Sequence, residues 1–196
     1  MGEYTDSVED NLLGLTSKEE INEAEAVGVI QAETWLTKLD YPLHITPYFF
    51  LDLHHTAFSH LYEWAGKWRT STPNVGSFLP PPPVKIPQLM YEFADDLRFR
   101  MTQIEPTDRD AVAELLAFAH HKLVFIHPFT NGNGRSSRLL TNALAYNYGY
   151  DEVVLYQREA GDSRKKYLQA IKLGDDYNLS ELKQLILQQL TPLALS

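Results

Sequence analysis

The stretch HPFTNGNGRSSR, residues 127–138, decides how this chain is read. It lies between two apolar runs with helical spacing, AVAELLAFAHHKLVFI at 111–126 and SSRLLTNALAYNYG at 136–149. Apolar residues that recur at this spacing are typical of amphipathic helices, so the stretch is predicted to be a tight connection between two packed helices. A simple connection rarely needs a histidine, an aromatic residue, paired glycines and paired arginines. We therefore interpret it as a candidate functional site.

Gly132 and Gly134 indicate an anion hole. Glycines let successive backbone N–H groups turn toward one point. A helix that begins at about Arg135 adds its unpaired N–H groups and the positive end of its dipole. Arg135 and Arg138 are three positions apart, so their guanidinium groups lie on neighbouring positions of one helix face. This combination fits a diphosphate or triphosphate better than a single carboxylate.

His127 ends the first apolar run and precedes Pro128, which disfavours helical backbone angles at the histidine. We therefore expect His127 to point into the site. An imidazole with an unperturbed pKa of about 6.5 suits a general base that takes a proton from a hydroxyl group as its oxygen attacks phosphorus. Phe129 is expected to anchor the loop onto the core. A lone histidine is more often structural, but this one accompanies a glycine turn and two arginines.

Helix start and stop signals are present along the chain. Ser17 and Glu20 have the spacing of a capping box, and Thr46 precedes a proline suited to a first helical position. Gly149 suits the left-handed cap at a helix end, and Ser180 is expected to cap the last helix. The expected helices span about 17–39, 47–66, 87–104, 108–126, 135–148, 162–174 and 180–190.

The pattern between these helices completes the predicted fold class. Residues 69–84 break the helical spacing and contain a short piece with strand propensity between turn residues, and 152–158 reads as a second extended piece. The run Pro80–Pro83 is expected to be extended polyproline II, forming a rigid loop wall or, as an alternative, a ligand for an SH3-like groove. With at least seven helices and no internal repeat, the chain is predicted to be all-α.

Composition limits the classes of function. The 196 residues, 44% of them hydrophobic, fit one domain with a sizeable core. A net charge of −9 argues against broad nucleic-acid or anionic-membrane binding, because both need a basic field. The absence of cysteine excludes disulfides and thiolate zinc sites. The acidic N-terminus lacks the features of a signal peptide and no run approaches the roughly 20 apolar residues of a membrane span, so a soluble, cytoplasmic protein is expected.

The motif at 127–138 resembles the signature of the Fic family, His-x-Phe-x-acid-Gly-Asn-Gly-Arg-x-x-Arg, and LYEWAGKWRT at 61–70 resembles a second segment of that family. With INEAEA at 21–26, the chain is most similar to the branch called mobile mystery protein B. The resemblance implies a Fic-type helical domain of about seven to nine helices with a short β-hairpin flap. It places an acidic tail at 1–16 and the domain at 17–196, with the flap at about 69–84 and a C-terminal helix at about 180–190.

The resemblance also implies an activity, the transfer of AMP from ATP to a Ser, Thr or Tyr hydroxyl of a target protein. By this resemblance His127 is the general base, Gly132, Asn133 and Gly134 form the anion hole, and Arg135 and Arg138 hold the β- and γ-phosphates. Residues 75–79 would align the target by strand pairing. ATP is the implied co-substrate and Mg²⁺ the implied metal.

Asn131 departs from the family pattern, because it stands where an acidic residue holds Mg²⁺ between the phosphates. A neutral carbonyl binds this hard cation more weakly than a carboxylate does. The substitution leaves open an attenuated transferase, a different phosphate-containing donor, and a nucleotide-binding partner module. Phosphotransfer of the related Doc type is a further alternative, although Gly134 favours AMP transfer, since the Doc loop has no second glycine.

Two other readings remain at the level of sequence. An all-α metal hydrolase could use His54, His55, His60, His120 and His121, although no familiar metal motif is present. Self-inhibition is the second, since Thr16 and Glu20 have the spacing of a family segment whose glutamate pairs with the second arginine. Glu20 also serves the capping box, and restraint by a separate small antitoxin-like protein is equally open.

Overall fold

The secondary structure of the described residues is mainly helical. The computed structural model describes residues 10–73, 75, 78–156 and 161–193. Within these residues the order of elements is α1 (Lys18–Leu36), α2 (Pro47–Phe58), the 3-10 helix η1 (Pro83–Lys85), α3 (Ile86–Met101), α4 (Arg109–Ile126), α5 (Asn133–Asn147), α6 (Asp162–Gly174) and α7 (Ser180–Leu187). The prediction of an all-α fold is confirmed.

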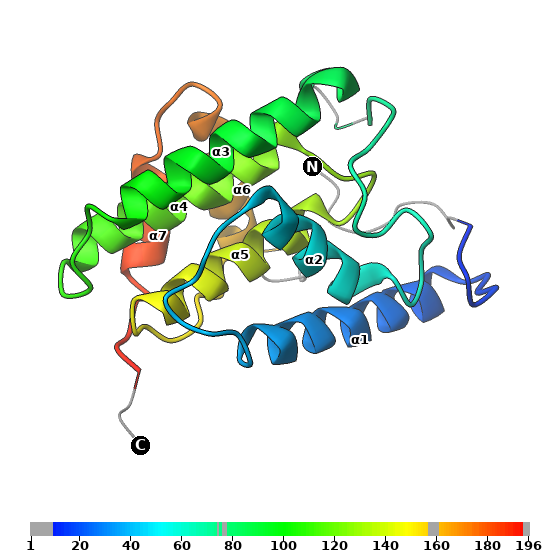
Figure 1. The fold of residues 1–196 in the computed structure, drawn as a ribbon, viewed down its shortest axis with the longest axis horizontal. Helices are drawn as coiled ribbons and strands as arrows, with labels where there is room; N and C mark the ends of the chain where they lie inside the picture. The colour runs from blue at the N-terminus through cyan, green and yellow to red at the C-terminus, as the bar shows by residue number, and fades with distance from the viewer. Residues whose placement is uncertain (1–9, 74, 76–77, 157–160, 194–196) are drawn as a thin grey trace.

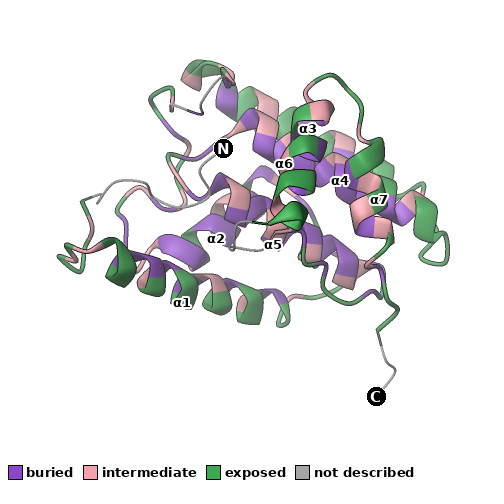
Figure 2. Ribbon diagram, turned by 180° about the vertical axis from the view of Figure 1, so that it is seen from behind, coloured by how far each residue is buried: buried purple, intermediate pink, exposed green. Residues whose placement is uncertain are grey.

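Helix α5 lies at the centre of the arrangement (Figure 1). It packs against α4 on one side and against α1 and α2 on the other, while α4 also contacts α3 and α7. The burial pattern follows this arrangement, since α1 alternates between buried and exposed positions whereas α5 is buried over most of its surface (Figure 2). The helix that begins at the candidate site is therefore also the core of the fold.

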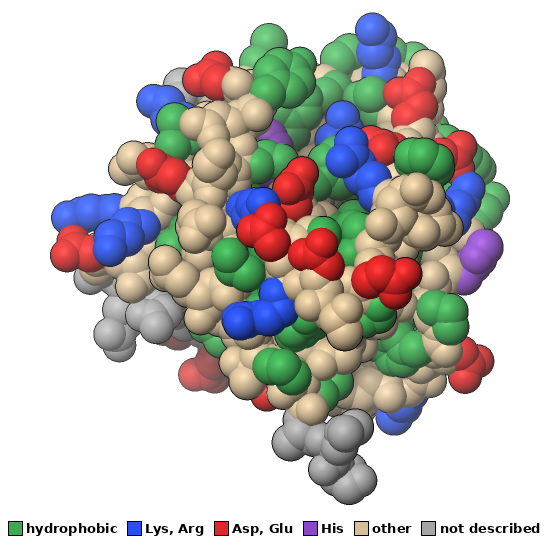
Figure 3. All heavy atoms as spheres, turned by 90° about the vertical axis from the view of Figure 1, so that its left-hand side faces the viewer, with side chains coloured by type: hydrophobic (Ala, Val, Ile, Leu, Met, Phe, Trp, Pro, Cys, Tyr) green, Lys and Arg blue, Asp and Glu red, His purple; other side chains and the backbone are tan. Residues whose placement is uncertain are grey.

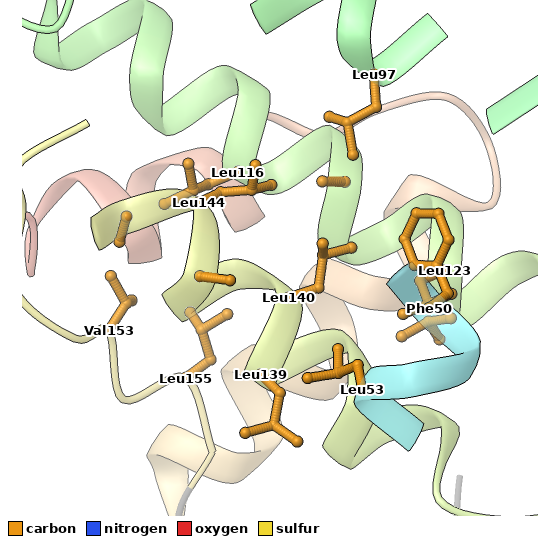
Figure 4. Packing of buried hydrophobic residues seen from close by; sticks show 14 of the residues in the cluster. Phe50, Leu53, Leu97, Leu116, Leu123, Leu139, Leu140, Leu144, Val153 and Leu155 are labelled. Carbon is orange, nitrogen blue, oxygen red and sulfur yellow. The ribbon is translucent and has the colours of Figure 1, made fainter. Parts of the chain in front are cut away.

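Apolar side chains from four other segments pack around those of α5. Leu139, Leu140 and Leu144 of α5 are at most 2% exposed. Figure 4 shows them beside labelled residues of α2, α3, α4 and the 153–155 segment, namely Phe50, Leu53, Leu97, Leu116, Leu123, Val153 and Leu155. Fully burying one such side chain contributes about 1.5–3 kcal/mol, so this cluster fixes the position of α5.

The predicted start signals of the first two helices are confirmed. The Ser17 side chain accepts a hydrogen bond from the backbone N–H of Glu20, and the Glu20 carboxylate accepts one from Ser17 N–H. Thr46 caps α2, with Pro47 at its first position. Gly149 follows α5 with φ +76°, the left-handed conformation that glycine adopts readily.

Several predicted boundaries were wrong, and α1, α3 and α7 each end three residues before the predicted position. The second helix ends at Phe58 rather than at Gly66, because the chain turns through residues 59–66. Helix α5 begins at Asn133 rather than Arg135, so its first turn includes more of the motif. Ser180 is the first residue of α7 rather than its cap, and its N–H donates to the Asn178 side chain at 3.1 Å.

The predicted extended pieces form little regular pairing in the described part of the chain. In the predicted flap, Val75 and Phe78 form an isolated antiparallel bridge, and Phe78 N–H donates to Val75 O at 3.2 Å. Residues 74 and 76–77 of the flap lie outside the described residues. In the second piece the N–H groups of Val153 and Val154 donate to the side chains of Asn142 and Gln189 instead of to a neighbouring strand.

Helix α1 packs unusually close to α2 at Gly28. A Cβ atom at this position would lie 1.9 Å from the carbonyl oxygen of Ala57 and 2.4 Å from Cε1 of His60. Just before this contact, the ring Nε2 of His60 donates to the carbonyl oxygen of Ala24 at 2.9 Å. These contacts fix the register of α1 against α2.

The surface of the described residues is mixed in charge. On the face shown in Figure 3, acidic side chains lie beside Lys and Arg side chains, and no continuous basic patch is seen among the atoms drawn in colour. None of the helices in the described ranges combines the length and the apolar composition that crossing a membrane requires.

Candidate active site

His127 lies at the C-terminal end of α4 and leaves the helix in the left-handed conformation, with φ 51° and ψ 57°. Positive φ is uncommon for residues other than glycine and marks a backbone held by its surroundings. Nδ1 of the imidazole lies 3.3 Å from the carbonyl oxygen of Val124. Because a carbonyl can only accept, Nδ1 carries the hydrogen and Nε2 is left as the basic nitrogen.

Burial lowers the pKa of His127 to about 4. The hydrogen bond to Val124 opposes this lowering, and the positive charge of Arg69 adds a smaller one. The sequence suggested an ordinary imidazole. The partly buried imidazole is instead neutral throughout the physiological range, so it is always in the form that accepts a proton. The lower pKa also makes it a weaker base than a free imidazole.

The loop after His127 is closed by Asn133. Its Oδ1 accepts from Phe129 N–H and its Nδ2 donates to Phe129 O, both at 2.9 Å. Phe129 is fully buried, as predicted for an anchor. The side chain of Asn133 therefore holds the turn, which leaves its backbone N–H as the group that the predicted anion hole can use.

Gly132 precedes α5 with φ +76°, and a Cβ atom here would lie 2.7 Å from the ring of Phe58. Only glycine meets both requirements without strain. The first turn of an α-helix leaves backbone N–H groups without intrahelical acceptors, and in α5 these belong to Asn133, Gly134 and Arg135. The loop therefore has the backbone geometry of an anion hole at the positive end of a helix dipole.

Asn131, the predicted metal residue, is turned into the loop. Its Oδ1 accepts from Gly132 N–H at 2.7 Å and lies 3.5 Å from Nη2 of Arg135. Its backbone carbonyl accepts from Nε2 of His54 at 3.1 Å. In this conformation the amide oxygen stabilises the turn.

His54, which the sequence offered only as a candidate residue of a metal hydrolase, instead holds the motif loop. Nδ1 of its fully buried ring accepts from Gly66 N–H at 2.9 Å, so Nε2 carries the hydrogen that is donated to Asn131. The ring stacks on Phe129 with centroids 3.7 Å apart. Burial lowers the pKa of His54 to about 3, so the ring stays neutral. The segment at 61–70 is thereby joined to the motif loop.

Arg69 is a second site residue that the sequence did not predict. Its side chain is buried, and its Nε donates to the carbonyl oxygen of His127 at 2.6 Å. Its backbone N–H donates to Pro128 O at 2.9 Å. The sequence could have indicated Arg69 because it lies in LYEWAGKWRT, the second segment that resembles the family. An arginine in a loop is, however, usually interpreted as a solvated surface residue.

Arg135 is paired with a buried carboxylate from α1. Its Nη1 lies 2.5 Å from Oε2 of Glu25, and the two residues are 6% and 2% exposed. Oε1 of Glu25 accepts from the hydroxyl of Tyr62 at 3.0 Å, and the guanidinium lies 4.6 Å from the centroid of the Phe58 ring. Glu25 was not predicted, because a glutamate within a helix of alternating acidic residues usually faces solvent.

Arg138 lies one turn further along α5 and is partly exposed. Its guanidinium carbon lies 5.2 Å from the centroid of the Tyr156 ring. A cavity of about 170 Å³ beside it is lined by both motif arginines and by Glu33 and Glu152. Burial, and then the negative charge of Glu152, raises the pKa of Glu33.

Two residues of the alternative predictions, His120 and Glu20, make other contacts. Both ring nitrogens of His120 are used within the core, by Thr141 and Tyr167 at 2.9 Å each. No group of three His, Cys, Asp or Glu side chains suited to a metal occurs in the part of the chain that the structure describes. The carboxylate of Glu20 is exposed and accepts from Ser17, as the capping box predicts.

Comparisons with known proteins agree with the motif. A model of the Fic/DOC family matches residues 44–145. Protein adenylyltransferase Fic of Drosophila willistoni is 35% identical over 136 residues, which are 68% of this chain and 25% of that protein. The protein of the same name in Drosophila virilis is 31% identical over 175 residues, 88% of this chain and 34% of that protein. The chain thus spans about a quarter to a third of the length of these curated relatives.

Solved structures share the fold. The BepC protein of Bartonella tribocorum, a VirB-translocated effector with bound AMPPNP, has a TM-score of 0.78 and 18% identity, with 97% of this chain and 96% of that chain covered. At this identity the likeness concerns the fold alone. The family model, by contrast, covers more than half of the 196 residues and includes the whole motif from His127 to Arg138. The chain belongs to the Fic/DOC family.

Proposed function

We propose that this chain is a protein adenylyltransferase that moves AMP from ATP to a Ser, Thr or Tyr hydroxyl of a target protein. One observation carries the proposal: a neutral imidazole with Nε2 as its basic nitrogen precedes the first turn of α5, where backbone N–H groups have no intrahelical acceptors. The Drosophila relatives are named protein adenylyltransferases, and the Bartonella protein of the same fold has bound AMPPNP.

In the proposed reaction the hydroxyl oxygen of the target attacks the α-phosphorus of ATP. Its proton passes to Nε2 of His127, the bond between the α-phosphorus and the bridging oxygen to the β-phosphate breaks, and pyrophosphate leaves. The chain's contribution is to hold the phosphates, orient the hydroxyl and accept the proton. A base with a pKa of about 4 accepts that proton as the new P–O bond forms, when the hydroxyl becomes acidic.

Phosphate binding is assigned to the hole and the two arginines. The backbone N–H groups of Asn133 and Gly134 would line the hole, while Gly132, whose own N–H donates to Asn131, shapes it through its positive φ. Arg138 supplies a partly exposed cation for the terminal phosphates. Arg135 is assigned a weaker role in binding the phosphates, because its Nη1 is paired with Glu25. Its Nε has no acceptor among the described residues. The anion hole, rather than the charge of Arg135, then carries most of the binding.

Mg²⁺ is part of the proposal only as a companion of the nucleotide. Of the motif residues, Asn131 would contact it, and its amide oxygen now accepts from Gly132 and lies near Arg135. One neutral oxygen fits Mg²⁺ poorly as a protein ligand, so the phosphates must provide most of the coordination. When bound, the metal would neutralise part of the phosphate charge.

The hydrogen bonding of Asn131 favours a second candidate function. With the oxygen of Asn131 engaged in the turn, the chain could bind nucleotide with attenuated transfer, or use another phosphate-containing donor, and act chiefly as a partner module. Restraint by a small antitoxin-like protein stays a prediction from the resemblance, as does the alignment of the target by residues 75–79.

Labelled ATP separates these candidates. The purified protein is incubated, alone and in lysate, with ATP labelled either at the α- or at the γ-phosphate. Label from the α-position alone supports AMP transfer, whereas label from the γ-position supports phosphotransfer. His127→Ala must abolish the labelling while ATP binding measured by calorimetry persists, and His44→Ala, at an exposed histidine of the 37–46 connection, is the matched control. ATP binding without label from either position leaves the partner-module candidate.

A further inference from the structure

The guanidinium of Arg69 joins the end of α4 to both ends of the predicted flap, one of them only two residues from Arg69 itself. Besides His127 O, it donates from Nη1 to Ser71 O at 2.9 Å and from Nη2 to Pro81 O at 2.5 Å. A longer contact of 3.5 Å joins Nη2 to Ile126 O. The side chain is only 3% exposed. All of these acceptors are backbone carbonyls, so the arginine recognises chain geometry and not a particular side chain.

The electrostatics of this arrangement favour a cation. Ile126 and His127 contribute the last carbonyl groups of α4, which have no acceptor role within the helix and lie at the negative end of its dipole. Arg69 satisfies them, as basic side chains do near helix C-termini. Its planar fork can reach several acceptors at fixed angles, which the single ammonium group of a lysine cannot do.

The other acceptors lie at the two ends of the predicted flap. Ser71 enters this segment and Pro81 leaves it, next to the polyproline run. Between them Val75 is buried and Phe78 packs against Phe125 of α4 with ring centroids 5.3 Å apart. One guanidinium therefore holds both ends of the segment against the backbone of the residue that carries the basic imidazole.

We propose that Arg69 is a positioning residue that fixes Ser71 and Pro81, and with them any segment bound along the flap, relative to the imidazole of His127. Among the described residues its hydrogen bonds go to backbone carbonyls, and it is not a catalytic residue. The functional part of this inference rests on the proposed transfer of AMP. The structural part, the coupling between the flap ends and His127, stands without it.

The test compares Arg69→Lys with Arg69→Gln. The matched control is Arg109→Gln at the far end of α4, because Arg109 also donates to carbonyls at a helix C-terminus, those of Leu187, the last residue of α7, and of Leu190 beyond it. The first measurements need no activity: amide hydrogen exchange at Phe78, whose N–H donates to Val75 O, and at residue 69, whose N–H donates to Pro128 O, and titration of the His127 ring by NMR. Arg69→Lys keeps the charge without the fork, and it also serves as the second variant if Arg69→Gln folds poorly.

We expect exchange at the flap amides to accelerate by at least about tenfold in both Arg69 variants and not in the control, because charge-assisted hydrogen bonds are lost. Loss of the positive charge in Arg69→Gln should raise the pKa of His127, whereas Arg69→Lys should leave it closer to that of the parent. Flap exchange in both variants that matches the control would overturn the inference, whatever the activity.

Transfer provides the functional arm. With α-labelled ATP, both Arg69 variants should label proteins on the order of 100-fold more slowly, since small misplacements at a reacting centre have effects of this size. ATP affinity should stay within about twofold of the parent, because the anion hole is untouched. An equal loss of affinity and transfer would assign Arg69 to nucleotide binding and contradict positioning. Absence of label in the parent would instead contradict the proposed function, while hydrogen exchange still decides on the role of Arg69.

Discussion

At the scale of single residues, His127 shows how a buried site alters a familiar side chain. Its pKa lies near 4, so the folded protein keeps the imidazole neutral until the pH falls through that value. We predict that the ring resonances of His127, followed by NMR in the nucleotide-free protein, titrate with a midpoint near 4. A midpoint at about 6.5, the value of a free imidazole, would contradict the burial of the ring and the influence of Arg69.

Glu25 and Arg135 form a buried ion pair whose two halves depend on each other. Removing one partner leaves an uncompensated charge in a dry site, which typically destabilises a protein by about 3–5 kcal/mol. We predict a loss of this order for Glu25→Gln, measured by urea unfolding, although glutamine can still accept from the Tyr62 hydroxyl. Glu23→Gln, at an exposed position of the same helix, should change stability little.

The double variant Glu25→Gln with Arg135→Met tests the cause of that loss. Methionine removes the unpaired charge and approximates the length of the side chain, so part of the lost stability should return. If the losses of the two single variants simply add, the pair is not coupled and the charge is not the reason.

Asn131 is the motif residue where the family pattern and this chain differ. We predict that Asn131→Asp strengthens the binding of ATP when Mg²⁺ is present, because a carboxylate is a better ligand for this cation than an amide oxygen. In chelator the same carboxylate repels the phosphates, so ATP should bind no better than to the parent. Calorimetric titration with and without chelator checks both statements, and improved binding in chelator would contradict the electrostatic reason.

For single residues, the sequence predicted the motif but not the residues that hold the motif in place. Loop chemistry is local, so the glycines, His127 and the paired arginines can be recognised from their spacing. His54, Arg69 and Glu25 contact the same loop from positions roughly 60 to 110 residues earlier in the chain. No periodicity links them to the motif, and each resembles an ordinary surface or core residue until the fold brings them together.

At the scale of elements, the close approach of α1 to α2 can be tested at Gly28. Alanine normally stabilises a helix by about 1 kcal/mol relative to glycine. Here its methyl group would overlap the carbonyl of Ala57 and the ring of His60. We predict that Gly28→Ala lowers the free energy of unfolding and displaces Glu25 from Arg135, whereas Val27→Ala at the exposed neighbouring position has little effect. Thermal melts of the three proteins would decide, and a more stable Gly28→Ala variant would refute the close contact.

Elements with strong local signals were predicted well. The capping box of α1, the Thr46 and Pro47 start of α2 and the glycine after α5 each follow from local backbone chemistry. The predicted second helix was too long because residues 59–66 are apolar enough to continue the pattern. They leave the helix so that Gly66 can donate to His54, a tertiary contact that periodicity cannot show.

At the scale of the whole molecule, the two halves of the chain meet at α5. The helices before the flap provide Glu25 and His54, and those after it provide the loop and the arginines. His120 of α4 bonds Thr141 of α5 and Tyr167 of α6, so one buried ring joins three helices. Buried neutral histidines therefore hold both the site and the core, and this makes the stability of the whole domain depend on pH.

The last prediction concerns that dependence. Burial lowers the pKa of both His54 and His120 to about 3. Between this value and the unfolded value of about 6.5 the unfolded chain binds more protons than the folded one. Stability is therefore full above about pH 6.5 and falls as the pH drops, by up to about 1.4 kcal/mol per pH unit for each histidine.

Urea unfolding between pH 7.5 and 4.5 measures the slope. His120→Gln should lower stability at pH 7.5, because the bonds to Thr141 and Tyr167 are weakened, but it should reduce the slope by one histidine's share. Thr141→Val loses a hydrogen bond at the same place yet keeps the titrating ring, so its stability should fall by a similar amount at every pH while the slope stays that of the parent. Equal slopes in His120→Gln and Thr141→Val would show that protonation of the unfolded chain at His120 does not drive the loss in acid.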